Sequence, residues 1–270
     1  MSAIGRLAVI GGGRMGEAIV GGLLAADAVV AADIVIAEPN GTRRDELATA
    51  HSVSVVDDGA AALHGADTVL LAVKPQVLDD VLTALAPGIP AGALVVSIAG
   101  GFTCARLESL LPPGTAVVRV MPNTPALVGQ GMALISGGSE ATPEHVERVR
   151  ALFGAIGEAI VIDERYQDAG TAISGCGPAY VALFVDALAR AGVREGLTRD
   201  VAQRLALQTL RGTVELIERT GQHPEAVVDA VASPGGATIA AIAELEAKGF
   251  RTAVSSAVRA AVKRARELGS

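Results

Sequence analysis

The fold of this chain is decided by the stretch Val9-Ile10-Gly11-Gly12-Gly13-Arg14-Met15-Gly16-Glu17-Ala18. It places the pattern G-x-G-x-x-G directly after a short apolar run and directly before a helical run, which is the context of a dinucleotide-binding turn. Gly11 permits the tight turn, Gly13 lets the backbone approach a pyrophosphate, and Gly16 lets the helix pack on the strand. The helix N-terminus then faces the anion. We therefore predict a dinucleotide-binding βαβ unit at the start of the chain.

Strands and helices continue to alternate beyond this stretch. Strand-like runs at residues 34–37, 68–73, 94–98, 116–120 and 132–136 are separated by helical segments or Pro/Gly turns, and the last strand signal ends near 160–163. Such alternation indicates a parallel sheet. From residue 164 onward apolar residues recur at helical spacing, in segments that we expect to end at Gly192, Gly196, Gly221 and Gly249. We predict an α/β fold class, with an N-terminal Rossmann domain over 1–163 and an all-helical domain over 164–270.

Composition excludes several function classes. The chain has 22 Lys+Arg against 29 Asp+Glu and shows no basic stripe, so we expect no nucleic-acid partner. Cys104 and Cys176 are the two cysteines and lack a metal-ligand spacing, so we expect neither a disulfide framework nor a metal site. No run reaches the ~18 uninterrupted apolar residues of a membrane span, and no leader pattern follows Met1. These patterns predict a soluble, cytoplasmic protein without a membrane partner.

An acidic residue ends the second predicted strand. Glu38 lies about twenty residues after the glycines, where a carboxylate accepts hydrogen bonds from the adenosine ribose, and taken alone it favours NAD. Asn40, Thr42, Arg43 and Arg44 follow at once. They would hold a 2′-phosphate if Glu38 turned away, or they would only solvate the start of an exposed helix. The preference between the two cofactors stays open at this point.

Three further predicted strands end in small or polar segments: Ala72-Val73-Lys74-Pro75, Ser97-Ile98-Ala99-Gly100-Gly101 and Met121-Pro122-Asn123-Thr124-Pro125. Ligands bind at the carboxyl ends of the strands in an open sheet, so we expect these segments to lie along a nicotinamide ring. Lys74 is either an acid or a solvated lysine whose backbone does the binding. Each of these segments alone is weak evidence for a cofactor site, and the three together reinforce one another.

Two glycine-rich segments lie in the helical half. Ser233-Pro234-Gly235-Gly236-Ala237-Thr238 opens a helix, so it either exposes backbone N–H groups to a carboxylate or forms an ordinary cap. Ser174-Gly175-Cys176-Gly177-Pro178-Ala179-Tyr180 precedes a long helix, and we interpret it as a turn between helix and sheet, because G-x-S-x-G and a triad histidine are absent.

These residues together resemble the pyrroline-5-carboxylate reductase family. The resemblance runs from Gly11–Gly16 through 72–75, 121–125 and 174–180 to Val231-Ala232-Ser233-Pro234-Gly235-Gly236-Ala237-Thr238, which is close to a family signature. It implies a C-terminal helical domain that dimerises by interleaving with its partner, dimers that often assemble into a ring such as a decamer, and an active site that needs two subunits. The family usually prefers NADPH, and Glu38 leaves NADH possible.

The resemblance also implies the roles of individual residues. Thr238 would be the catalytic residue that hydrogen-bonds the imine nitrogen. The implied substrate-binding residues are Glu164, Ser233, Gly235, Gly236, Ala237 and Thr238. The expected cofactor-binding residues are Ile10, Gly11, Gly12, Gly13, Arg14, Met15, Gly16, Glu38, Asn40, Ala72, Val73, Lys74, Pro75, Ala99, Gly100 and Asn123.

The implied reaction is the NAD(P)H-dependent reduction of 1-pyrroline-5-carboxylate to L-proline, the last step of proline biosynthesis. One alternative is another imine reductase or a β-hydroxyacid dehydrogenase of the same two-domain plan. The dehydrogenases need a lysine early in the helical half, whereas the lysines here are Lys74, Lys248 and Lys263. A second alternative is a non-catalytic nucleotide-sensing relative, which the intact segment 233–238 argues against.

Overall fold

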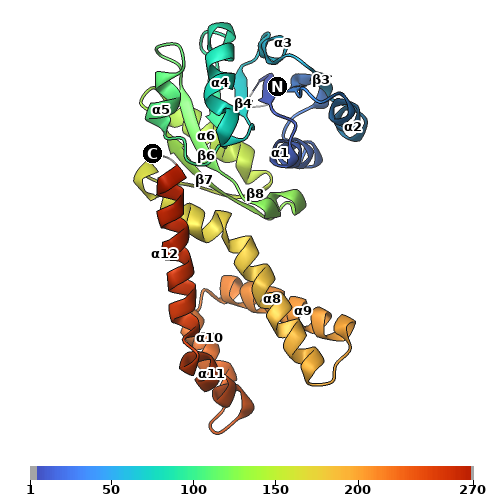
Figure 1. The fold of residues 1–270 in the computed structure, drawn as a ribbon, viewed down its shortest axis with the longest axis vertical. Coiled ribbons are helices and arrows are strands. Elements are labelled where there is room, and N and C mark those ends of the chain that lie inside the picture. The colour runs from blue at the N-terminus through green and yellow to red at the C-terminus, as the bar shows by residue number, and fades with distance from the viewer. Residues whose placement is uncertain (1–4, 269–270) are drawn as a thin grey trace. The chain divides into compact units, whose positions relative to one another are not determined.

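The computed structural model describes residues 5–268, and their first part forms one sheet covered by helices on both faces (Figure 1). The strand order is β3-β2-β1-β4-β5-β6-β7-β8. The strands are β1 (Leu7–Ile10), β2 (Ile34–Ala37), β3 (Ser54–Val56), β4 (Thr68–Leu71), β5 (Leu94–Ser97), β6 (Val117–Met121), β7 (Gly131–Gly137) and β8 (Gly157–Val161). The predicted strand-like runs are all present, and the three-residue β3 is an addition to them.

The predicted parallel sheet is confirmed, with one antiparallel pairing. β1 to β6 pair in parallel, β7 runs antiparallel to β6, and β8 is parallel to β7. The link from β6 to β7 holds only the short 3₁₀ segment Thr124–Val128. A parallel crossover needs a dozen or more residues, so this short link forces the chain to turn back.

The strands β1, β2, β4 and β5 are buried along their whole length and on both faces, which explains their largely apolar sequences. Leu7 and Val9 of β1 join one core cluster, and Ala8 and Ile10 join the other. The helices that cover the sheet are α1 (Arg14–Ala25), α2 (Gly41–His51), α3 (Gly59–Leu63), α4 (Pro75–Leu85), α5 (Cys104–Ser109) and α6 (Pro143–Gly154). The first cluster takes residues from α1, α2 and α6, and the second from α3, α4 and α5.

The remainder of the described chain is helical, as predicted. It comprises α7 (Gln167–Gly170), a π-helical turn (Thr171–Gly175), α8 (Gly177–Arg194), α9 (Arg199–Thr220), α10 (Pro224–Val231), α11 (Ala237–Ala247) and α12 (Phe250–Leu268). Gly177–Ala260 forms one compact unit, and the other described residues form the second. Residues 164–176 are thus grouped with the sheet, while the predicted domain boundary at 163/164 stays a prediction.

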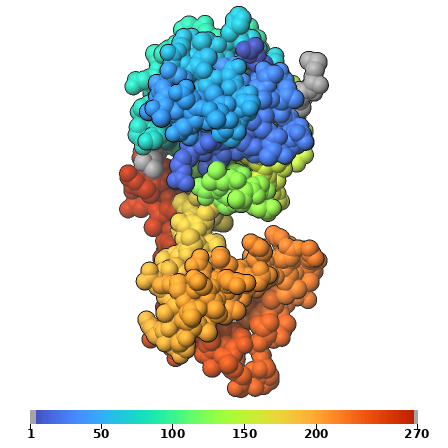
Figure 2. Space-filling model, turned by 90° about the vertical axis from the view of Figure 1, so that its right-hand side faces the viewer, coloured from blue at the N-terminus to red at the C-terminus, as the bar shows by residue number. Residues whose placement is uncertain are grey.

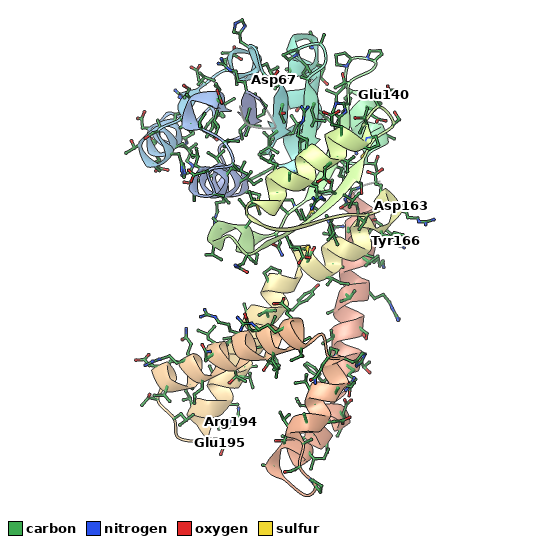
Figure 3. All side chains as sticks on the ribbon, turned by 180° about the vertical axis from the view of Figure 1, so that it is seen from behind. Asp67, Glu140, Asp163, Tyr166, Arg194 and Glu195 are labelled. Carbon is green, nitrogen blue, oxygen red and sulfur yellow. The ribbon has the colours of Figure 1, made fainter. Side chains whose placement is uncertain are left out.

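One local expectation for the helical part was wrong. Gly192 does not end a helix but lies inside α8, where a Cβ would come within 3.1 Å of the Cβ of Ala202 on α9. It therefore lets the two helices approach closely. Gly196 and Gly221 do follow helix ends with positive φ, the first in the loop where Figure 3 labels Glu195. The segment around Ser174, interpreted as a turn between helix and sheet, includes a π-helical turn in which Cys176 N–H donates to Thr171 O.

The unit Gly177–Ala260 buries little apolar surface of its own. Its buried hydrophobic residues are Ala189, Ala202, Ala206 and Val227. Large aliphatic side chains instead lie exposed on α8 and α9, which Figure 2 shows in yellow and orange; they include Val181, Leu183, Leu205 and Val214. By length and composition the helical run Glu164–Arg194 could also cross a membrane, and 11% of its apolar window is buried. Within this unit no other described segment packs over these exposed side chains.

Candidate cofactor and substrate sites

Five parallel strands bring the predicted cofactor segments to one edge of the sheet. β1, β2, β4, β5 and β6 all run in the same direction, so the residues that follow them lie along their common carboxyl edge. The strand order reverses between β1 and β4, where β1 leads into the glycine loop. Ligands bind at such a point in open α/β sheets. The structure therefore gathers segments that are up to about a hundred residues apart in the sequence.

The geometry at each glycine of the loop is compatible with the role that the motif predicts. Gly11 has φ +108°, and a Cβ there would lie 2.8 Å from Ala72 O. A Cβ on Gly16 would overlap Gly11 O, so only glycine allows this packing of α1 on β1. A Cβ on Gly13 would meet no described atom within 4 Å. Gly13 is also the N-cap of α1, and no described side chain caps this end. The first turn of α1 therefore has backbone N–H groups without a side-chain cap, which fit a pyrophosphate.

Glu38 lies beside this loop, as the ribose-binding role requires. Its Oε2 accepts a hydrogen bond from Gly12 N–H at 3.1 Å, and its Oε1 accepts one from Asn40 N–H at 3.0 Å. Asn40 is the N-cap of α2, where its Oδ1 accepts from Arg43 N–H. Two backbone donors thus fix the carboxylate of Glu38 at the end of β2.

Arg43 and Arg44 are not simply solvated. The Nε of Arg43 donates to Gly12 O at 3.0 Å, and its guanidinium forms ion pairs with Glu17 and Glu46. The side chain of Arg44 donates to the backbone carbonyls of Glu38 and Pro39. Both arginines therefore hold the corner between β2 and α2 together.

The other predicted cofactor residues differ in how their side chains are used. Lys74 is an exposed N-cap of α4, and Ala99 is buried beside the open Gly100. Asn123 is 8% exposed. Its Nδ2 donates to Ser174 O at 2.9 Å and its Oδ1 accepts from Met132 N–H at 2.8 Å. Asn123 thus ties the exit of β6 to the π-helical turn.

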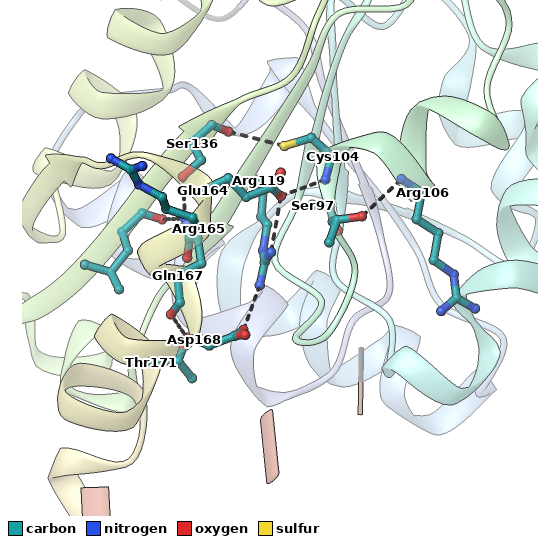
Figure 4. Close-up of polar contacts among 12 residues, drawn as sticks. Ser97, Cys104, Arg106, Arg119, Ser136, Glu164, Arg165, Gln167, Asp168 and Thr171 are labelled. Carbon is teal, nitrogen blue, oxygen red and sulfur yellow. Dashed lines mark hydrogen bonds and ion pairs between the residues drawn. The ribbon is translucent and has the colours of Figure 1, made fainter. Parts of the chain in front are cut away.

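A cluster of charged side chains lies at the start of the helical segment (Figure 4). Arg119 points from β6 and its side chain is 7% exposed. It pairs with Glu164 at 3.2 Å and with Asp168 at 3.8 Å. Glu164 also accepts a hydrogen bond from Cys104 N–H at 2.7 Å. Arg119, Glu164 and Asp168 line a pocket together with Gly101, Thr103, Arg165, Ala265 and Arg266.

Cys104 lies next to this cluster but is not a nucleophile. Burial, followed by the negative charge of Glu164, raises the pKa of its thiol to about 12. The thiol therefore stays neutral at physiological pH, and only the thiolate reacts readily. Within the described residues no group of three or more His, Cys, Asp or Glu could hold a metal ion.

The segment Ser233–Thr238 forms a sharp turn before α11. Gly235 has φ +68°, Gly236 N–H donates to Ser233 O, and Gly236 is the N-cap. No described side chain caps the helix, so the N–H groups of its first turn lack a side-chain partner at its positive end. Thr238 is half-buried at the second helical position. This geometry fits a small carboxylate.

The sequence of a curated pyrroline-5-carboxylate reductase from Synechocystis sp. is 47% identical over 264 residues, which cover 98% of each chain. The chain belongs to the pyrroline-5-carboxylate reductase family. Two family models agree: pyrroline-5-carboxylate reductase dimerisation matches residues 164–268, and NADP oxidoreductase coenzyme F420-dependent matches residues 6–101. The predicted family is thereby confirmed, and the β-hydroxyacid and sensor alternatives are not favoured.

Solved reductases of this family share the whole fold. The Plasmodium falciparum pyrroline carboxylate reductase, solved with NADP bound, superposes with a TM-score of 0.91 at 32% identity and covers 100% of both chains. The pyrroline-5-carboxylate reductase from Coxiella burnetii superposes with a TM-score of 0.92 at 32% identity, with 99% coverage of both. This family member is therefore an oxidoreductase that uses a nicotinamide cofactor.

Two charged groups of this family member, Arg119 and Glu17, were not predicted from the sequence. Arg119 is a lone charge in the apolar strand Val117–Met121, and a charge in a buried strand requires a partner. That signal predicts a pair, but it does not identify Glu164 and Asp168. Glu17 stood in the quoted glycine stretch, yet its contact with Arg43 bridges 26 residues. Nothing local in the sequence indicates that contact.

Proposed function

We propose that this chain is a pyrroline-5-carboxylate reductase that reduces 1-pyrroline-5-carboxylate to L-proline, the last step of proline biosynthesis. When bound, the reduced nicotinamide would supply a hydride to the imine carbon, which is C2 of the pyrroline ring and becomes C5 of proline, while the ring nitrogen takes up a proton. The protein then needs mainly to hold donor and acceptor carbons together, and such positioning can lower a barrier by ~7–11 kcal/mol. The observation that carries the substrate assignment is the uncapped N-terminus of α11 in a member of this family.

The turn before α11 is proposed to bind the substrate carboxylate. Its ligands are the backbone N–H groups around Ala237, together with Ser233, Gly235 and Gly236, since a helix N-terminus favours an anion. The hydroxyl of Thr238 orients the imine nitrogen or relays its proton. We retain Glu164 as a substrate neighbour, with a carboxylate already anchored by Arg119.

The carboxyl edge of the sheet is proposed to bind the cofactor. The residues are those of the glycine loop, Ile10 to Gly16, with Glu38, Asn40, Ala72, Val73, Lys74, Pro75, Ala99, Gly100 and Asn123. Asn123 contributes its backbone and the position of its loop, because its amide group is engaged elsewhere. We propose NADPH as the cofactor, and the position of Glu38 supports NADH as a second one.

A homodimer is proposed to cover the apolar surface of Gly177–Ala260. Four small or medium hydrophobic residues are buried there, while Leu183 is 71% exposed and Leu205 is 54% exposed. Exposed apolar patches of this kind mark interfaces. The ion pair of Asp186 with Arg190 lies in the same helix, and a membrane interior disfavours such charges. We therefore assign this surface to a second copy of a soluble, cytoplasmic enzyme, with a ring such as a decamer as a further assembly.

Absorbance at 340 nm tests the reaction. We expect oxidation of NADPH only when 1-pyrroline-5-carboxylate is present, with L-proline as the product by mass spectrometry. Thr238→Ala should lower kcat at least tenfold, whereas Thr83→Ala should not, because the Thr83 hydroxyl bonds to Asp79 O within its own helix. Full kcat and KM in Thr238→Ala would remove the proposed role of Thr238. A wild-type enzyme that oxidises neither NADPH nor NADH with the imine would refute the function.

A further inference from the structure

The corner between the glycine loop and α2 contains a half-buried cation, Arg43. Arg43 is the third residue of α2, close to the position where an arginine accommodates the 2′-phosphate of NADP. Its guanidinium instead contacts Gly12 O, Glu46 and Glu17. The side chain is 26% exposed. Arg43 is therefore bound to its own chain at the place where a free arginine would decide cofactor choice.

Glu17 is the partner that holds Arg43 toward the loop. It lies in the first turn of α1, directly after the glycines, and its other oxygen lies 3.4 Å from His51 Nε2. Burial raises the pKa of Glu17, but Arg43 and His51 outweigh that effect, so the pKa lies below its usual value. Glu17 is ionised at neutral pH. Glu46, the other acidic partner, is 57% exposed, and an exposed pair on one helix contributes little.

The charges at this corner do not favour a 2′-phosphate. Glu17, Glu38 and Glu46 carry three negative charges, whereas Arg43 and Arg44 carry two positive ones. A dianionic phosphate is bound by arginines whose N–H groups are available to it. The N–H groups of Arg43 are shared among two carboxylates and a carbonyl. Removing the half-buried carboxylate of Glu17 changes both the net charge and the availability of Arg43.

We propose that Glu17 is a specificity-determining positioning residue, which limits NADPH use relative to NADH by holding Arg43 against the glycine loop. This inference rests on the proposed cofactor function. Without Glu17 the guanidinium of Arg43 turns outward to the 2′-phosphate, while the ribose contact of Glu38 is unchanged. The carboxylate of Glu17 is engaged by Arg43 and His51, so it acts on the cofactor site through Arg43.

Calorimetric titration of the full-length protein with 2′,5′-ADP and with 5′-AMP tests the proposal. Glu17→Gln should raise the ratio of the two affinities at least fivefold in favour of 2′,5′-ADP, and the ratio of kcat/KM for NADPH over NADH should rise in parallel. The double variant Glu17→Gln with Arg43→Met should lose this gain. Glu147→Gln is the matched control, because it removes a paired carboxylate from the distant helix α6. Its ratio should stay within twofold of wild type.

Arg43→Met alone keeps the proposal testable if Glu17→Gln does not fold. Because Arg43 is engaged with Glu17 in the wild type, its loss should change the affinity ratio less than threefold. A tenfold loss of 2′,5′-ADP relative to 5′-AMP would show that Arg43 already binds the phosphate, which overturns the proposal. So would an unchanged ratio in folded Glu17→Gln. Failure of the wild type to bind either nucleotide would instead refute the cofactor function itself.

Discussion

Gly13→Ala should separate cofactor binding from stability. Gly13 has φ −67° and ψ 178°, which alanine adopts without strain, and its Cβ would meet no described atom within 4 Å. Alanine restricts the unfolded chain, which stabilises by about 0.4–1 kcal/mol, whereas alanine is a poorer N-cap than glycine by a similar amount. The two effects nearly cancel, so the free energy of unfolding should change by less than about 1 kcal/mol. The melting temperature should then shift by no more than about 4 °C.

The same methyl group should weaken the binding of a dinucleotide. The added Cβ occupies the space by which the backbone approaches the pyrophosphate. We expect the Kd for NADPH to rise at least tenfold, which is about 1.4 kcal/mol. Thermal unfolding and fluorescence titration of the same samples check both halves of the prediction. Gly154→Ala is the control, since its Cβ also meets open space but lies at the end of α6. An unchanged Kd in folded Gly13→Ala would mean that this loop does not bind the pyrophosphate.

Four further outcomes are expected. Arg119→Met removes the buried partner of Glu164 and should cost about 3 kcal/mol, or about 6–12 °C in melting temperature; a shift under about 2 °C would contradict the pairing. Cys104, with a thiol pKa of about 12, should resist iodoacetamide at pH 8 in the folded protein, and labelling at the rate of a free thiol would count against its burial. Glu17 has a lowered pKa in the folded protein, so its stabilising contribution is present above pH 4.5 and is lost as the pH falls through the folded pKa. Urea unfolding from pH 6 to pH 3 should show the wild type losing its advantage over Glu17→Gln. Leu183→Glu places a charge on the exposed face of α8 and should reduce the oligomer to a smaller species in size-exclusion chromatography, whereas an unchanged elution volume would place the interface elsewhere.

The parts of the fold that depend on residues close together in the sequence could be predicted. The glycine turn requires a strand before it and a helix after it, and both requirements are satisfied within Leu7–Ala25. The helices of the second half follow from their apolar spacing. The reversal of β7 was missed, although the short link before it is visible in the sequence. Gly192 was misinterpreted because its role depends on its contact with Ala202 of the next helix rather than on the residues of its own helix.

Side-chain roles at the site depend on partners that the sequence does not identify. Asn123 could be assigned to the cofactor edge, but its amide group is taken up by Ser174 and Met132. Arg119 could be recognised as needing a carboxylate, but several acidic residues were available. Long-range pairing of this kind depends on the chain bringing the 3₁₀ segment Glu164–Tyr166 back to β6, which no local pattern contains.

Cofactor choice is the clearest case of such dependence. Residues 38–44 offer an acidic group for a ribose and two arginines for a phosphate, and from these residues alone both cofactors fit. The arginines can bind a phosphate only if their N–H groups are available to it. Glu17 on α1 determines whether the N–H groups of Arg43 are available. Two chains with the same residues after β2 would therefore differ in cofactor preference if they differed at the first turn of α1. Specificity at this corner is a property of the strand end and the glycine helix together.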